Sequence, residues 1–332
     1  MLAVFLAAAP AAAASERAHA LDGSELNQWD KYFLARAKPI DIQPGLGPIS
    51  MRVSTNDPNA QLWFNQGLAQ LFGFAHEDAI WSFRKALEYD DRLAMAWWGI
   101  AWAYGPNINL GADAKRARAA HDAVQSARAL LRFATDRERA YIDAISDRYD
   151  PRYEPVGDLP RRPLDVQFWE RMNRLRASYP GDEHAATLTA EAGLDLDPWN
   201  QWTKEGAPTT YTRDVIAILE DVLKRVPDHV GAQHYYIHGV EAGPNPGDAD
   251  LVAARIKSDA YGQPHLVHAA SHIYARVGDW GSAMISGDDA EYQDELYLGR
   301  NGTDNLYTLA HGSHNIHFEA SVASMGGRRR IA

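Results

Sequence analysis

Residues 60–93, AQLWFNQGLAQLFGFAHEDAIWSFRKALEYDDRL, decide the fold of this chain. Small and aromatic residues recur in this stretch at the spacing of a helix–turn–helix repeat of about 34 residues, at Gly67, Ala79, Phe83 and Ala86. Small residues let two antiparallel helices approach closely, and large residues fill the space between neighbouring helix pairs. The stretch therefore predicts a packed pair of helices that recurs along the chain.

Two further segments show the same spacing. The unit that begins at residue 94 carries, on the corresponding offsets, Trp97, Ile100, Ala101 and Tyr104. A later unit carries Ser271, Tyr274, Gly278, Ala283 and Ala290. Because one helix pair cannot bury its apolar face alone, this recurrence predicts pairs that stack on one another.

These motifs resemble the tetratricopeptide repeat family. The segments GLAQLFGF and EDAIWSFRKALE carry the resemblance, which is closest over 60–110 and less close over 264–297. Asp91 departs from the family pattern, in which proline is common, and Gly287 stands where a large residue is expected. The resemblance implies an all-α fold, a helix-pair solenoid in a single curved array. The wider pattern is similar to bacterial secreted tetratricopeptide proteins with histidine-rich C-terminal repeats, and this similarity implies no particular activity.

Helices are also predicted outside the repeats. Thr135 and Glu138 form a capping box at a helix start. Apolar spacing predicts further helices over residues 164–178 and 215–226. Connectors are expected at two proline-containing segments, 150–163 and 195–210. Apolar and polar residues do not alternate over any long stretch, so strands are not expected.

The N-terminal residues 1–14 form an apolar run that ends in Ala12-Ala13-Ala14-Ser15. This pattern is typical of a signal peptide, and an uncleaved apolar helix is the alternative, since the usual basic residues before it are missing. We therefore expect a periplasmic or secreted protein with no membrane span after signal removal. The expected organisation is a signal peptide over 1–14, an N-terminal extension over 15–50, a tetratricopeptide-like helical domain over 51–325 and a basic tail over 326–332.

The composition argues against several functions. A net charge of −11 and a pI near 5.6 argue against nucleic-acid binding, which needs a basic surface. The sequence has no cysteine, which excludes disulfide bonds, iron–sulfur clusters, thiolate zinc sites and thiol nucleophiles. A bound metal ion would therefore need imidazole, carboxylate or other oxygen ligands.

Histidine is concentrated in one part of the sequence, since nine of the thirteen histidines lie between residues 229 and 317. An α-helix advances about 100° per residue, so spacings of three and four place side chains on one face. Three trios have such spacing: His234, His238 and Glu241; His265, His268 and His272; His311, His314 and His317. We predict that each trio lies on one face of its own helix.

A His-x-x-x-His spacing suits a metal ion because adjacent helical turns bring two ring nitrogens to one point. The glutamate found inside this motif in helical zinc proteases is missing here, which argues against a metalloprotease. We predict that facing helices bind a transition metal ion, copper, zinc or iron. The predicted ligands are His234, His238, His265, His268, His272, His314 and His317. Glu241 is expected as a further ligand or as a general base.

The remaining histidines are weaker candidates. His76 lies in the predicted turn of the first repeat, where it is either an ordinary turn residue or an additional ligand or acid–base group. The others are expected to be ordinary hydrogen-bonded core or surface residues: His19, His121, His184 and His229.

Two classes of function remain open. The first is a metal-binding protein, with catalysis left undecided. The second is an interaction scaffold that binds a protein or peptide partner in the concave groove of a helix-pair array. The histidines could also form a buried polar network or a pH-responsive cluster. Metal binding is favoured because a scaffold has no need for histidines that share a helix face.

Overall fold

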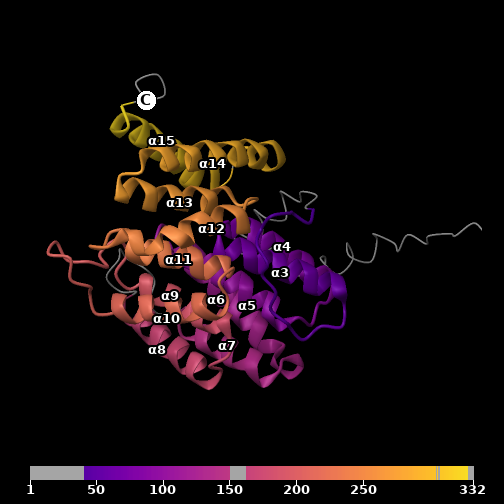
Figure 1. Cartoon of the computed structure of the whole chain (residues 1–332). Coiled ribbons are helices and arrows are strands. Elements are labelled where there is room, and N and C mark those ends of the chain that lie inside the picture. The colour runs from indigo at the N-terminus through magenta and orange to yellow at the C-terminus, as the bar shows by residue number, and fades with distance from the viewer. Residues whose placement is uncertain (1–40, 150–161, 304, 306, 328–332) are drawn as a thin grey trace, which may run out of the picture. The chain divides into compact units, whose positions relative to one another are not determined.

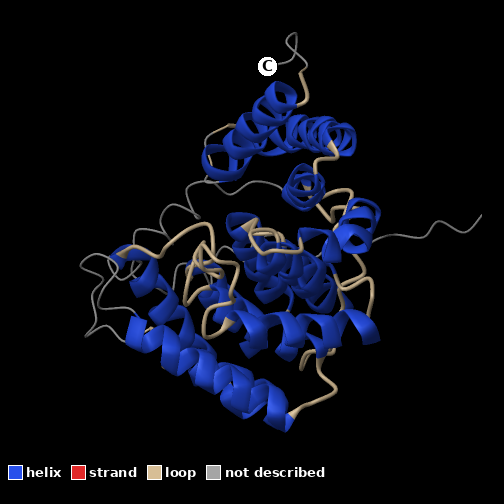
Figure 2. Cartoon of the chain, turned by 60° about the vertical axis from the view of Figure 1, so that its left-hand side comes forward, coloured by secondary structure: helices blue, strands red, loops and turns tan. Residues whose placement is uncertain are grey.

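The computed structural model describes residues 41–149, 162–303, 305 and 307–327. Helices joined by turns and loops make up this described part of the chain, and none of its residues belongs to a β-strand (Figure 2). The all-α class predicted from the sequence is therefore confirmed. No described helix is both long and apolar enough to cross a membrane.

The helices follow one another along the chain as Figure 1 shows. Their bounds are α3 Pro58–Phe72, α4 His76–Tyr89, α5 Ala94–Tyr104, α6 Ala114–Ala129, α7 Asp136–Ser146, α8 Arg162–Ser178, α9 Glu183–Leu194, α10 Thr212–Arg225, α11 Val230–Val240, α12 Asp250–Asp259, α13 Pro264–Val277, α14 Trp280–Asn301 and α15 Ser313–Met325. Short helical turns lie at η1 Leu131–Phe133, η2 Pro246–Ala249 and η3 Thr308–Gly312.

The first predicted repeat forms the packed helices α3 and α4, and α4 also packs against α5. The fully buried ring of Phe83 in α4 explains the two glycines that face it. A Cβ atom on Gly67 of α3 would lie 2.7 Å from this ring, and one on Gly99 of α5 would lie 2.4 Å from it. Glycine at both positions therefore lets the neighbouring helices close around one phenyl ring.

Several local predictions are confirmed. Thr135 and Glu138 form the predicted capping box at the start of α7. The helices predicted over 164–178 and 215–226 are α8 and α10, and the segment 195–210 contains no helix. Most of the predicted connector 150–163 lies outside the described residues, as do the predictions for 1–14, 15–40 and 328–332.

A close backbone approach positions α11, and a side-chain hydrogen bond positions α13. A Cβ atom on Gly231, in the first turn of α11, would lie 2.4 Å from the ring of Phe72 at the end of α3. Helix α13 begins at Pro264, as predicted, because proline is preorganised for the first turn. Just before this helix, the side-chain Nε2 of Gln263 donates to the Leu46 carbonyl oxygen at 2.7 Å. Both helices are thereby held against the N-terminal part of the described chain.

Replacing Gly99 by alanine is expected to lower the free energy of unfolding by about 1–3 kcal/mol, because the added methyl group would overlap the Phe83 ring. Urea denaturation measures this difference. Gly299→Ala in α14 is the matched control, since a Cβ atom there meets no described atom within 4 Å. The control substitution should leave the free energy of unfolding unchanged or raise it by up to about 1 kcal/mol. Equal stability of the two variants would contradict the close packing around Phe83.

Candidate metal centre

Histidines from α11, α13 and α15 lie close together, and all of them are buried except His314, which is partly exposed. Three sets of side chains have potential ligand atoms within 4.8 Å of one another: His234, His238 and His265; His268, His272 and His314; His238, Glu241 and His272. We call the first set the inner group and the second set the outer group. Glu241, the residue that caps the C-terminal end of α11, lies between them.

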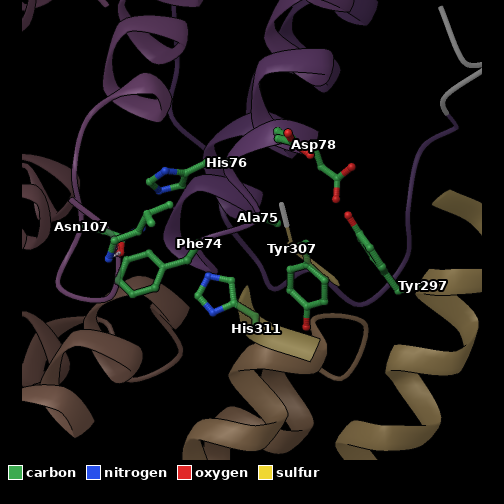
Figure 3. A pocket seen from close by; sticks show the side chains of 10 residues that line it. Phe74, Ala75, His76, Asp78, Asn107, Tyr297, Tyr307 and His311 are labelled. Atoms are coloured by element: carbon green, nitrogen blue, oxygen red, sulfur yellow. Dashed lines mark hydrogen bonds between the residues drawn. The ribbon is translucent and has the colours of Figure 1, made fainter. Parts of the chain in front are cut away.

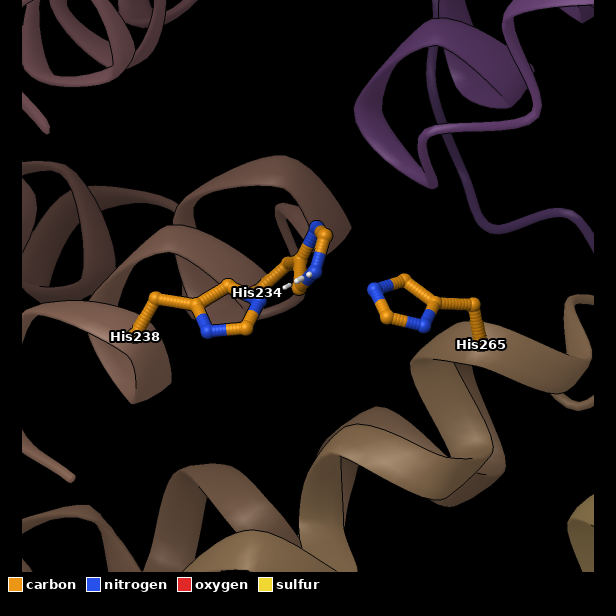
Figure 4. A group of neighbouring side chains, drawn as sticks. All are labelled: His234, His238 and His265. Carbon is orange, nitrogen blue, oxygen red and sulfur yellow. Dashed lines mark hydrogen bonds between the residues drawn. The ribbon is translucent and has the colours of Figure 1, made fainter. Parts of the chain in front are cut away.

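The histidines of α13 are divided between the two groups, whereas the sequence predicted one trio on one face. His265, in the first turn of α13, points toward the α11 side chains His234 and His238 (Figure 4). His268 and His272 lie further along α13, where they meet His314 of α15. The division follows from the packing of α13 against both α11 and α15.

In the inner group, two imidazoles direct lone pairs at each other. The Nδ1 atom of His234 lies 2.7 Å from the Phe72 carbonyl oxygen, and the Nδ1 atom of His238 lies 2.7 Å from Glu241 Oε1. Both oxygens only accept hydrogen bonds, so each Nδ1 atom carries the proton. The two Nε2 atoms are 3.1 Å apart and both are then left with lone pairs. The two Nε2 atoms can therefore share a cation, either an extra proton or a metal ion.

His265 adds a third imidazole with no competing partner. Its ring centroid lies 5.0 Å from that of His234 and 6.2 Å from that of His238. The side chain is 1% exposed, and neither ring nitrogen has a hydrogen-bond partner among the described residues. Because a buried polar atom without a partner costs about 1–3 kcal/mol, both ring nitrogens of this histidine are available to bind a ligand.

The outer group also brings three imidazole nitrogens close together. The Nε2 atom of His272 lies 2.8 Å from His268 Nε2 and 3.3 Å from His314 Nε2. The Phe318 ring stacks on the His272 ring, with centroids 4.5 Å apart. His314 is the least buried of the three histidines. The outer group is therefore the one closer to solvent.

Glu241 connects the two groups through hydrogen bonds from both Nδ1 atoms. Its Oε1 accepts from His238, and its Oε2 accepts from His272 at 2.5 Å. Burial by itself raises the pKa of Glu241, but His272 and the hydrogen bonds from both imidazoles bring this pKa well below its ordinary value. The carboxylate is therefore ionised, and each of its oxygens accepts a hydrogen bond from an imidazole.

Burial works against additional protons in this region. It lowers the pKa values of His234, His265 and His268 well below the ordinary value, and neighbouring imidazoles lower them further. Burial, followed by the neighbouring imidazoles, lowers the pKa of His311 to about 3 and that of His314 to about 4. Neutral imidazole is the form that binds a metal ion. At neutral pH these five rings are therefore in the neutral form that can bind a metal ion.

Another histidine pair in the same core shows how such a pair is satisfied without a metal ion. The Nδ1 atom of His229 accepts from the Ala232 amide at 3.1 Å, so its proton lies on Nε2 and is donated to His184 Nδ1 at 3.0 Å. His184 in turn donates from Nε2 to the Ser50 carbonyl at 3.1 Å. Every ring nitrogen has a complementary partner, which agrees with the prediction that these two histidines are ordinary structural residues.

Two aromatic residues next to the inner group have a backbone conformation that is unusual for large side chains. Phe74 has φ 58° and Trp199 has φ 60°, and glycine is the common residue in this region. The Phe74 ring lies 4.5 Å from that of His234, and the Trp199 ring lies 5.7 Å from that of His238. Such strain accumulates at functional sites, where the surrounding structure maintains it.

A pocket lies beside the inner group, and its wall includes His76, Asn107, Tyr307 and His311 (Figure 3). His311, which lines this pocket, has its ring 4.3 Å from that of His265 in the inner group. His76 is the first residue of α4 and belongs to none of the three ligand sets found among the described residues. Burial, and then the charge of Arg116, lower the pKa of His76 well below its ordinary value.

The structure brings together every predicted ligand except one. His317 is exposed on α15 and lies outside the ligand sets of the described chain. His311 was not among the predicted ligands, yet its ring contacts that of His265. The cause is the π-helical turn η3, which contains His311 and changes the angular spacing that an α-helix would give. Phe74 and Trp199 were not predicted as part of the site, since backbone strain leaves no mark in the sequence.

Neither the protein-family models nor the curated proteins compared with this chain match it. Function therefore has to be argued from the geometry of the site.

The chelator-treated protein is expected to lose stability as the pH falls below about 6.5, the ordinary histidine value. Burial, and then His184, lower the pKa of folded His229 to about 3, so between these pH values the unfolded chain binds the additional proton. This group alone contributes a slope of about 1.4 kcal/mol per pH unit. Asparagine at position 229 can still cap α11 but does not titrate.

The measurement is urea denaturation of the wild type and His229→Asn between pH 4 and 6.5. The variant should lose less stability per pH unit than the wild type, and the difference should be about 1.4 kcal/mol per pH unit, the contribution of one bound proton. Identical slopes would mean that His229 is not held neutral in the folded state.

Proposed function

We propose that this protein binds a transition metal ion at the inner group, with His234, His238 and His265 as ligands. The observation that carries the proposal is the pair of Nε2 atoms 3.1 Å apart whose lone pairs both face the same point. Burial disfavours a second proton on His234, which favours a metal ion as the cation shared by both rings.

The donor geometry fits this proposal. Two imidazole nitrogens bound to one tetrahedral ion, each at about 2.0–2.1 Å, lie about 3.3 Å apart, close to the observed separation. The hydrogen bonds from Nδ1 to Phe72 and Glu241 are the kind that orient metal-binding imidazoles. Three nitrogen ligands suit copper, zinc or iron and leave one position for a solvent molecule or another ligand.

We infer that the scaffold around this site is a tetratricopeptide-type array of helix pairs. The packing of Phe83 between Gly67 and Gly99 supports this inference, since it places small and large residues as the repeat pattern predicts. The consecutive contacts of α3 with α4, and of α13 with α14, support it as well. A periplasmic or secreted location is part of the proposal and depends on residues 1–14.

The double variant His238→Ala with His272→Ala is expected to bind little or no metal, because each group loses one imidazole and Glu241 loses both hydrogen-bond donors. Elemental analysis after gentle purification, and thermal shifts on adding zinc, copper or iron, measure this loss. His317→Ala is the matched control, since this exposed histidine lies outside the ligand sets of the described chain.

The control should retain the metal content of the wild type and its thermal shift. Wild-type protein without bound metal, and without a thermal shift on adding any of the three metals, would contradict the proposed function. Equal metal contents of the double variant and the wild type would place the ion elsewhere.

An interaction scaffold is the second candidate function, and one observation favours it. Ile285, Tyr292 and Leu296 lie along one face of α14 and are exposed by 58%, 59% and 41%. Exposed apolar surface of this kind can bind a protein or peptide partner.

If the protein is a scaffold, Ile285→Ser with Tyr292→Ser should weaken binding to a peptide library. The metal-free variant His238→Ala with His272→Ala should bind the library as the wild type does. The opposite result would favour the metal site as the functional element.

A further inference from the structure

The outer group has the elements of a second metal site. His268, His272 and His314 bring their ligand atoms within 4.8 Å of one another. His272 donates from Nδ1 to Glu241, so its Nε2 lone pair faces the other two Nε2 atoms, at 2.8 and 3.3 Å. These separations are close to the value of about 3.3 Å expected for imidazoles on one tetrahedral ion. The set draws on α13 and α15, so it does not depend on the α11 ligands.

The third set of ligand atoms, between the two groups, is already satisfied without a metal ion. His238 and His272 each donate a proton from Nδ1 to a different oxygen of Glu241. An ion bound there would have to displace both protons from short hydrogen bonds. The available lone pairs lie on the opposite edges of the same two rings, which places the ions in the inner and outer groups and leaves the carboxylate between them.

The two groups are neighbours in space. The ring centroids of His238 and His272 are 6.0 Å apart, and those of His265 and His268 are 6.1 Å apart. An ion lies about 3 Å from the centroid of an imidazole that binds it, so ions on His238 and His272 would be at most about 12 Å apart.

We propose, building on the function proposed above, that the chain binds two metal ions side by side, one in each group, and that Glu241 orients a ligand of each ion through its two oxygens. The pair shares a single carboxylate, so two divalent ions leave an excess of buried positive charge. Anions from solution, such as hydroxide, complete the coordination at the remaining positions. The outer ion is the more exchangeable one, because His314 is the most solvent-accessible ligand.

Native mass spectrometry of the zinc-loaded full chain tests the number of ions. The wild type should bind two ions, and His265→Asn in the inner group or His268→Asn in the outer group should each leave one. The variant with both substitutions should bind none, and His317→Ala should still bind two. Circular dichroism and thermal melting show which variants fold, and only folded variants are compared.

The two proposals fail in different ways in this experiment. A wild type without any bound ion overturns the proposed function. A wild type with one ion that is lost in His265→Asn and kept in His268→Asn overturns the pair and leaves the proposed function intact. One ion that is lost in both single variants also overturns the pair, because both groups would then be serving the same ion.

Proximity and the role of Glu241 need separate measurements. The EPR spectrum of the copper(II)-loaded wild type should show dipolar broadening that disappears in each single-site variant, and two ions without broadening would overturn the side-by-side arrangement. Glu241→Gln should weaken zinc binding about 10–100-fold at the inner group and also at the outer group, measured separately in the His268→Asn and His265→Asn backgrounds. Weakening at one group alone would overturn the shared role of the carboxylate.

Discussion

The carboxylate of Glu241 is the constraint on which the rest of the site depends. It accepts one hydrogen bond from His238 of α11 and another from His272 of α13, and all three side chains are buried. Each bond fixes a proton on Nδ1 and thereby directs the Nε2 lone pair of that ring away from the carboxylate. One ionised side chain therefore sets the tautomers of two imidazoles on different helices and divides the surrounding histidines into two groups.

The helical scaffold serves this arrangement by bringing backbones close together. Gly231 lets α11 approach the end of α3, and there the Phe72 carbonyl accepts the proton of His234 Nδ1. Two residues later, Phe74 has a left-handed backbone that large residues rarely adopt, and its ring packs against His234. The backbone is thus strained in the connection between α3 and α4. This connection supplies the inner group with the Phe72 carbonyl oxygen and with the apolar ring of Phe74.

Two histidine pairs in one core show why the type of residue alone does not define a site. His184 and His229 pair as donor and acceptor, and both rings are satisfied as neutral groups. His234 and His238 face each other as two acceptors because other oxygens already hold their Nδ1 protons. The spacing of His234 and His238 marked them as candidates in the sequence. That these two rings face each other as acceptors came into view only with the partners of the other ring nitrogens.

The sequence by itself determined the all-α class, the first helix pair, the capping box at Thr135 and the helical faces of His234, His238, His268 and His272, because all of these follow from local periodicity and end signals. Only the tertiary structure decided which histidines meet. It placed His265 beside His234 and His238 of α11, brought His311 near them through a π-helical turn and left His317 in solvent. The physical reason is that periodicity fixes how side chains point around one helix, whereas the crossing of α11, α13 and α15 is set by packing between residues far apart in the sequence.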